Sequence, residues 1–148
     1  DQFKGTVYRQ TMFAEFELAM GKMAENGEAL TADALCRKYH ELNKLYFGPD
    51  MISDDQIALE WARIPHFFYN YYVFQYATGF SAAVAIANRI LKEGAPAVAD
   101  YKKFLSGGCS TDPISLLKIA GVDMSSPLPV QQAMETFNQL LDEFESLL

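Results

Sequence analysis

The stretch that decides how this chain folds is IPHFFYNYYVFQYATGF, residues 64–80. Eight aromatic rings fall within its last 14 residues, and four of these rings are tyrosines. Pro65 biases the residue before it away from the helical region, so the chain is expected to break or kink there. The apolar residues that follow the proline predict a long helix over 67–91, which ends before Gly94.

Three helices are predicted before this stretch. The first ends near Asn26-Gly27 and has apolar residues at spacings of 3, 4 and 3, namely Phe13, Phe16, Met20 and Met23. Thr31 can cap the second helix, which ends at Gly48-Pro49-Asp50 and whose apolar face comprises Leu35, Tyr39, Leu42 and Tyr46. Ser53 and Gln56 form a capping box for a short third helix that runs to about Arg63.

Three more helices are predicted after the long one. Pro96 can begin a short helix to about Leu105, and a cap followed by a proline at 111–113 begins the next, which ends at Gly121. The last helix is amphipathic, with apolar residues at spacings of 4, 3, 4, 3 and 4: Val130, Met134, Phe137, Leu141, Phe144 and Leu148. No strand pattern, repeat or linker is found, so the sequence predicts one all-α unit over 1–148 with about seven helices.

Composition excludes several classes of protein. Half of the 148 residues are hydrophobic, which is incompatible with a disordered tail, and the net charge of −7 makes nucleic acid and anionic membranes poor partners. Residues 71–87 contain polar side chains and much alanine, so a buried helix is favoured over a membrane span. The two cysteines form no CxxC pair and no secretory signal opens the chain, which together favour a cytoplasmic protein.

In the second half of the predicted long helix, residues 81–87 are small and apolar on nearly all faces. A helix of this kind is usually packed on several faces. We therefore expect it to need many neighbours, some of them outside this chain.

The candidate chemistry lies in the aromatic stretch. On a regular helix, Tyr69 and Tyr76 lie within about 80° of His66, and Tyr72 lies about 120° away on that side. One imidazole and several phenols facing one cavity can donate hydrogen bonds to a developing oxyanion. The alternative, which the pattern alone favours, is a packed core in which each tyrosine hydroxyl meets a backbone carbonyl.

Other signals for chemistry are weak. Residues 40–44, HELNK, resemble the zinc-binding HExxH helix, but a lysine stands where the second histidine is required. No metal ligand is therefore predicted, and His40 is expected to be a surface or half-buried helix residue. Arg9 can pair with a carboxylate, although a solvated position is the more common outcome.

Three segments resemble one known family. Residues 63–79, RIPHFFYNYYVFQYATG, closely resemble the hallmark segment of oligoendopeptidase F, a branch of the thimet oligopeptidase-like zinc metallopeptidases. Residues 3–17, FKGTVYRQTMFAEFE, resemble the helix that follows the zinc ligands of that family. The C-terminal portion of that family is similar to residues 104–108, Pro113 and residues 120–124 of this chain. The three segments stand in family order and span essentially the whole chain.

The resemblance implies the C-terminal helical portion of a zincin-type oligopeptidase that hydrolyses short peptides. A metal-activated water and a glutamate base perform the chemistry in such enzymes. His66 matches the histidine of the family segment. The matching tyrosine is Tyr71 by its spacing from the histidine, or Tyr72 by alignment on Gln75-Tyr76. Tyr69 and Tyr76 are candidates for substrate binding, so the resemblance favours a site over a packed core.

The chain departs from the family in lacking HExxH and the third zinc ligand, a glutamate, which precede the matched region. We therefore expect zinc only in the parent enzyme and an inactive chain when it is alone. The implied partners are short peptides and the zinc-bearing part of the parent, with possible self-association through exposed apolar faces. The alternatives are a non-catalytic helical module that binds a peptide or hydrophobic ligand, and a helical oligomerisation unit.

Overall fold

The computed structural model describes all 148 residues and contains helices and no strand, which confirms the all-α prediction. Contacts within the chain group into two compact units, residues 1–77 and 78–148, and each is described by itself. A single unit over the whole chain stays a prediction. None of the helices combines the length and the apolar character that crossing a membrane requires.

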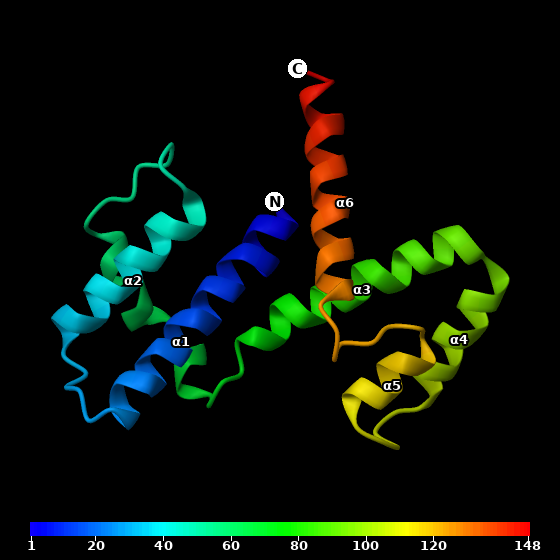
Figure 1. Ribbon diagram of the computed structural model, residues 1–148, viewed down its shortest axis with the longest axis horizontal. Helices are drawn as coiled ribbons and strands as arrows, with labels where there is room; N and C mark the ends of the chain where they lie inside the picture. The colour runs from blue at the N-terminus through cyan, green and yellow to red at the C-terminus, as the bar shows by residue number, and fades with distance from the viewer. The chain divides into compact units, whose positions relative to one another are not determined.

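Unit 1 is built on two helices that pack side by side, α1 and α2 (Figure 1). Its helical elements, in chain order, are the π-helical η1 (Phe3–Tyr8), α1 (Arg9–Glu25), α2 (Ala32–Phe47), and the 3-10 helices η2 (Ile57–Arg63) and η3 (Pro65–Phe68). The predicted caps of α2 are confirmed. Thr31 Oγ1 accepts a hydrogen bond from the Ala34 N–H at 3.2 Å, and Gly48 ends the helix with a φ of 78°.

The predicted apolar stripes of α1 and α2 face each other in the core of unit 1. The buried residues of this core are Met12, Phe13, Phe16, Leu35, Tyr39, Leu42, Ile64 and Val73. Phe67 packs edge-on against Phe13 and Phe16, with ring centroids 5.4 and 5.2 Å away. The N-terminal end of the aromatic stretch is therefore packed against α1.

A carboxylate on η2 ties three elements of unit 1 together. Glu60 accepts hydrogen bonds from Arg9 at 2.6 Å and from the Tyr39 hydroxyl at 2.5 Å, and it also pairs with Arg63. The expectation that Arg9 is solvated is wrong, because its guanidinium meets Glu60 and lies over the Phe13 ring. Desolvation alone would raise the pKa of Glu60. The hydrogen bonds from Tyr39 and Arg9 outweigh this effect, so the pKa of Glu60 is lower than its ordinary value.

The predicted capping box of the third helix does not form. Asp54 Oδ1 accepts from the Ile57 N–H at 2.9 Å, and the 3-10 helix begins at Ile57, three residues later than predicted. The Ser53 hydroxyl instead donates to Asn43 Oδ1 at 2.7 Å. Because the Ser53 hydroxyl contacts α2, it does not cap the third helix.

The predicted long helix over 67–91 begins later than expected. Its α-helical part is α3 (Phe74–Glu93), and residues 69–73 form an irregular turn. Asn70 and Tyr71 have φ values of 52° and 60°, which a right-handed helix cannot contain. The predicted end before Gly94 is confirmed.

Unit 2 contains α3 from Thr78 onward and the three helices that follow it (Figure 1). These are α4 (Ala95–Ser106), α5 (Pro113–Ile119) and α6 (Leu128–Glu145). Ala82, Ala85 and Ile86 of α3 pack on Ala120 and Val122. Ala83 and Ala87 of the same stretch are exposed in this chain. The expectation that some neighbours of this helix lie outside the chain stays a prediction.

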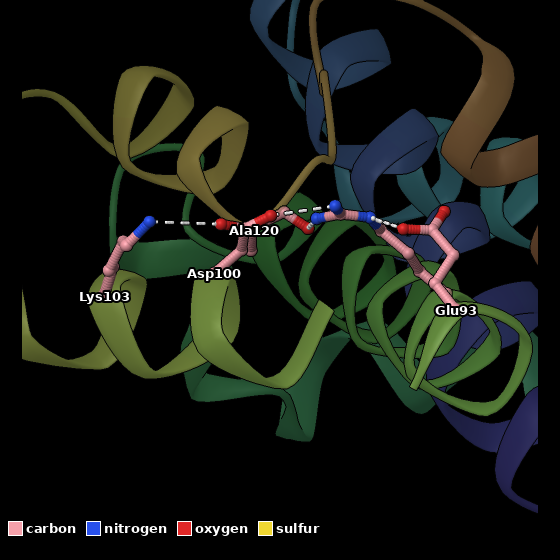
Figure 2. A network of polar contacts seen from close by, with 5 residues as sticks. Glu93, Asp100, Lys103 and Ala120 are labelled. Carbon is pink, nitrogen blue, oxygen red and sulfur yellow. Dashed lines mark hydrogen bonds and ion pairs between the residues drawn. The ribbon is translucent and has the colours of Figure 1, made fainter. Parts of the chain in front are cut away.

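Arg89 joins the elements of unit 2. Its guanidinium donates to Asp100 Oδ2 at 2.8 Å, to the Ala120 carbonyl at 2.8 Å and to Glu93 Oε2 at 3.0 Å (Figure 2). The hydrogen bond to Asp100 is the main reason that the pKa of Arg89 is raised. Gly121, directly after this carbonyl, has a φ of 80°.

We predict that Gly121→Ala destabilises unit 2 more than Gly108→Ala does. Both glycines have positive φ, and an alanine in such a position costs about 1–2 kcal/mol. A Cβ on Gly108 would meet nothing within 4 Å, whereas one on Gly121 would lie 2.5 Å from Arg89 Nη1. Urea denaturation measures the difference, and equal losses of stability for the two variants would contradict the role of Arg89.

We also predict that the Glu60 network makes stability depend on pH. A lowered pKa means that the carboxylate stabilises the fold above its ordinary value of 4.5 and that this is lost as the pH falls through the lowered pKa. From about pH 5 to about pH 3, the free energy of unfolding should fall more steeply in the wild type than in Glu60→Gln. The exposed Glu25→Gln is the matched control. Parallel curves for the wild type and Glu60→Gln would refute the prediction.

Candidate functional site

The turn at residues 69–73 shapes the candidate site. Before it, Ile64 is extended and Pro65 begins η3, as the proline predicts. After it, the side chain of Val73 is fully buried in the core of unit 1. Between these two attachments, Asn70 and Tyr71 reverse the chain in the left-handed region. Asparagine tolerates this region, but for a bulky residue such as tyrosine it is strained by about 1–3 kcal/mol.

Helix α1 holds the turn in this conformation. The Tyr71 N–H donates to Glu17 Oε1 at 2.8 Å, and Glu17 is only 6% exposed. The Tyr71 side chain lies against the backbone of α1 at Gly21, where its hydroxyl is 2.0 Å from the position that a Cβ would take. Any side chain at position 21 would therefore displace Tyr71.

The turn brings four of the five predicted site residues together. The Tyr72 ring stacks on His66 with centroids 6.0 Å apart and an angle of 18° between the ring planes. Tyr69 and Tyr76 meet the same imidazole edge-on at 5.6 and 5.7 Å, and the Tyr76 hydroxyl lies 3.2 Å from His66 Nε2. We call these four residues the His66 cluster. Tyr71 is not among them, because its ring faces α1.

The tyrosines of the His66 cluster are exposed at their positions in this chain, and so is Tyr71. Within this chain they therefore do not form the packed core, with each hydroxyl on a backbone carbonyl, that was the alternative. Tyr69 and Tyr76 are near His66 as predicted, but the cause differs. The turn folds the chain back, whereas a continuous helix over 67–91 was the premise of the prediction.

The His66 cluster presents hydrogen-bond donors. A hydrogen bond with Tyr72 is the main cause that raises the pKa of Tyr76, and desolvation and the charges of Tyr72 and Tyr69 add to it. The Tyr76 phenol is therefore protonated at neutral pH and can donate. Phenols and an imidazole N–H are groups that can donate to a carbonyl oxygen on which negative charge develops.

The chain brings no set of metal ligands together. No group of three or more His, Cys, Asp or Glu side chains is placed to hold a metal ion. His40, in the HELNK segment of α2, is half-buried as predicted, and its Nε2 lies 3.1 Å from the Ser53 carbonyl oxygen. The residues of this chain therefore do not fit a zinc site.

Two residues that shape the site, Glu17 and Gly21, were not among the residues predicted from the sequence. They are one helical turn apart, beside Phe16 and Met20 of the apolar stripe. A carboxylate on a buried helix face and a glycine inside a helix were the available signals. Neither signal identifies the partner Tyr71, which lies 54 residues after Glu17 and 50 residues after Gly21.

Comparison with known proteins gives concordant matches. The family model "Peptidase family M3" matches residues 1–136. Oligopeptidase PepF of Bacillus subtilis is 58% identical over 146 residues, which cover 99% of this chain and 22% of that protein. Group B oligopeptidase PepB of Streptococcus agalactiae is 45% identical over 148 residues, all of this chain and 25% of that protein.

A solved structure agrees with the sequence matches. The crystal structure of oligoendopeptidase-F from Enterococcus faecium is 50% identical, with a TM-score of 0.94. The likeness covers 98% of this chain and 28% of that one. The chain thus spans about a quarter of the length of the curated relatives it matches.

Proposed function

The chain belongs to peptidase family M3, and we propose on that premise that it is the C-terminal helical part of a zinc-dependent oligoendopeptidase. Its substrates are short peptides. Support comes from relatives named as oligopeptidases and oligoendopeptidases, whose likeness spans nearly all of this chain. The parent is proposed to be cytoplasmic, since both cysteines are free thiols.

The contribution of this chain is to bind the peptide and to stabilise the oxyanion. The observation that carries this proposal is the stacking of Tyr72 on His66, with the Tyr76 hydroxyl on the same imidazole. Tyr72 donates a hydrogen bond to the scissile carbonyl oxygen, and His66 holds the peptide beside it. Tyr69 and Tyr76 border this position and bind the substrate. Tyr71, whose ring faces α1, supports the turn and does not donate.

The zinc ion belongs, in this proposal, to residues of the parent outside this chain. The chain itself brings no fitting ligand set together, so no step of the reaction through zinc is assigned to its residues. Without the metal, the His66 cluster has donors but no activated water. The isolated chain is therefore inactive.

A comparison of the 148-residue chain with the longer protein tests this division. We expect the longer protein to cleave a short fluorogenic peptide and to lose that activity to a chelator. The chain alone should neither cleave the peptide nor retain stoichiometric zinc. Peptide hydrolysis and metal content, measured on the same samples, test this division of roles. Chelator-sensitive cleavage by the chain alone would overturn the proposal.

Substitution of the two adjacent tyrosines tests the assignment of the donor. In the longer protein, Tyr72→Phe should lower kcat by about 100-fold or more, because an oxyanion donor is lost. Tyr71→Phe should lower kcat far less. Steady-state kinetics of both variants and of His66→Ala gives the answer. A larger loss for Tyr71→Phe would assign the donor to Tyr71.

A second candidate function is a helical oligomerisation unit. The observation that favours it is the exposure of Leu141, Phe144 and Leu148 on the predicted apolar stripe of α6 and its end. In the main proposal, the exposed apolar faces pack on the rest of the parent. Sedimentation of the longer protein over a range of concentrations distinguishes the two, since only an oligomerisation unit makes the mass rise with concentration.

A further inference from the structure

We propose that Glu17 and Gly21 of α1 are positioning residues that set the placement of Tyr72 against His66. The inference deepens the proposed function and rests on it. Neither residue belongs to the His66 cluster. Both act through the turn at 69–73, and each does so by a different physical means.

Glu17 acts by a hydrogen bond to the backbone. Glu17 is buried and lines an open pocket of about 350 Å³, whose other lining residues come from α1, Phe67, the turn and neighbouring apolar side chains. A buried carboxylate requires donors, and the Tyr71 N–H supplies one at 2.8 Å. The amide meets Glu17 in a turn in which Asn70 and Tyr71 both have positive φ. The hydrogen bond therefore stabilises a backbone state that the tyrosine alone disfavours.

Gly21 acts by leaving space. The Tyr71 hydroxyl occupies the position beside the α1 backbone that any other side chain at 21 would fill. The ring therefore packs against α1 at Gly21, whereas the rings of Tyr69, Tyr72 and Tyr76 contact His66. Tyr71 thus contacts α1 twice, through the hydrogen bond of its amide to Glu17 and through the packing of its ring against Gly21.

A change in the turn alters the His66 cluster because His66 and Tyr72 are attached to the core through different segments. His66 lies on η3, which Phe67 fixes to Phe13 and Phe16 of the core. Tyr72 directly follows the left-handed pair, so the backbone angles of Tyr71 decide where its ring lies. If the turn relaxes, Tyr72 leaves the His66 ring while His66 stays in place. A displacement of about 1 Å at a catalytic group can cost about 100-fold in rate.

Variants at position 17 in the longer protein test this inference. Glu17→Ala removes the acceptor and should lower kcat by about 100-fold. Glu17→Gln keeps an oxygen acceptor and should recover most of that loss. Glu25→Ala, an exposed carboxylate on the same helix, is the matched control and should behave as the wild type. All assays are run well below the melting temperature of each variant.

A double-mutant cycle distinguishes positioning from a general structural role. If Glu17 acts through Tyr72, Glu17→Ala should cost much less kcat in a Tyr72→Phe background than in the wild type. Equal losses in both backgrounds would overturn the inference. Wild-type kcat in Glu17→Ala, with Tyr72→Phe still impaired, would also overturn it and would leave the proposed function intact. Unimpaired Tyr72→Phe and His66→Ala would instead contradict the proposed function.

Variants at position 21 give a test that does not need Glu17→Ala to fold. A Cβ on Gly21 would lie 2.0 Å from the Tyr71 hydroxyl but 3.3 Å from its Cζ, so removing the hydroxyl relieves the collision. Gly21→Ala should therefore lower kcat by about 10-fold or more with Tyr71 present, and by less than about 2-fold in a Tyr71→Phe background. Gly5→Ala, where a Cβ meets nothing within 4 Å, is the control. The same loss with and without the hydroxyl would refute the role of Gly21.

Discussion

The candidate site depends on one constraint, which is that Tyr71 is held with a positive φ by the buried carboxylate of Glu17. A tyrosine does not adopt this conformation unaided. The conformation interrupts the aromatic stretch, delays α3 to Phe74 and turns Tyr72 back onto His66. The arrangement of rings is thus determined by a contact from α1.

Both units fix an irregular segment by the same physical means. In unit 1, a carboxylate on a helix accepts from the backbone N–H of a left-handed residue. In unit 2, the Arg89 guanidinium on α3 donates to the carbonyl just before Gly121, which is also left-handed. Each charged group satisfies a backbone group that repetitive structure leaves unpaired. Each is accompanied by a glycine that leaves room for a close approach, Gly21 and Gly121.

The sequence predicted those features that local chemistry decides. The caps at Thr31 and Asp112 are correct because a cap is made by residues three positions apart. The start of the long helix was wrong because a partner 54 residues earlier decides it, and no local pattern identifies such a partner. For the same reason, the choice between Tyr71 and Tyr72 stayed open. The side chains of Tyr71 and Tyr72 have different contacts, and this can be recognised only when the backbone angles of the turn are known.

The exposure of the His66 cluster bears on how it would work. Hydrogen-bond donors stabilise a developing oxyanion strongly only where water is excluded, because water competes with them and screens their charge. In this chain the tyrosines of the His66 cluster are open to solvent, although the Tyr71 anchor holds their geometry. Under the proposed function, the cluster would therefore supply orientation, and its electrostatic effect would require a cover from substrate or from the rest of the parent. On this reasoning, restoring zinc alone to the isolated chain would not restore activity.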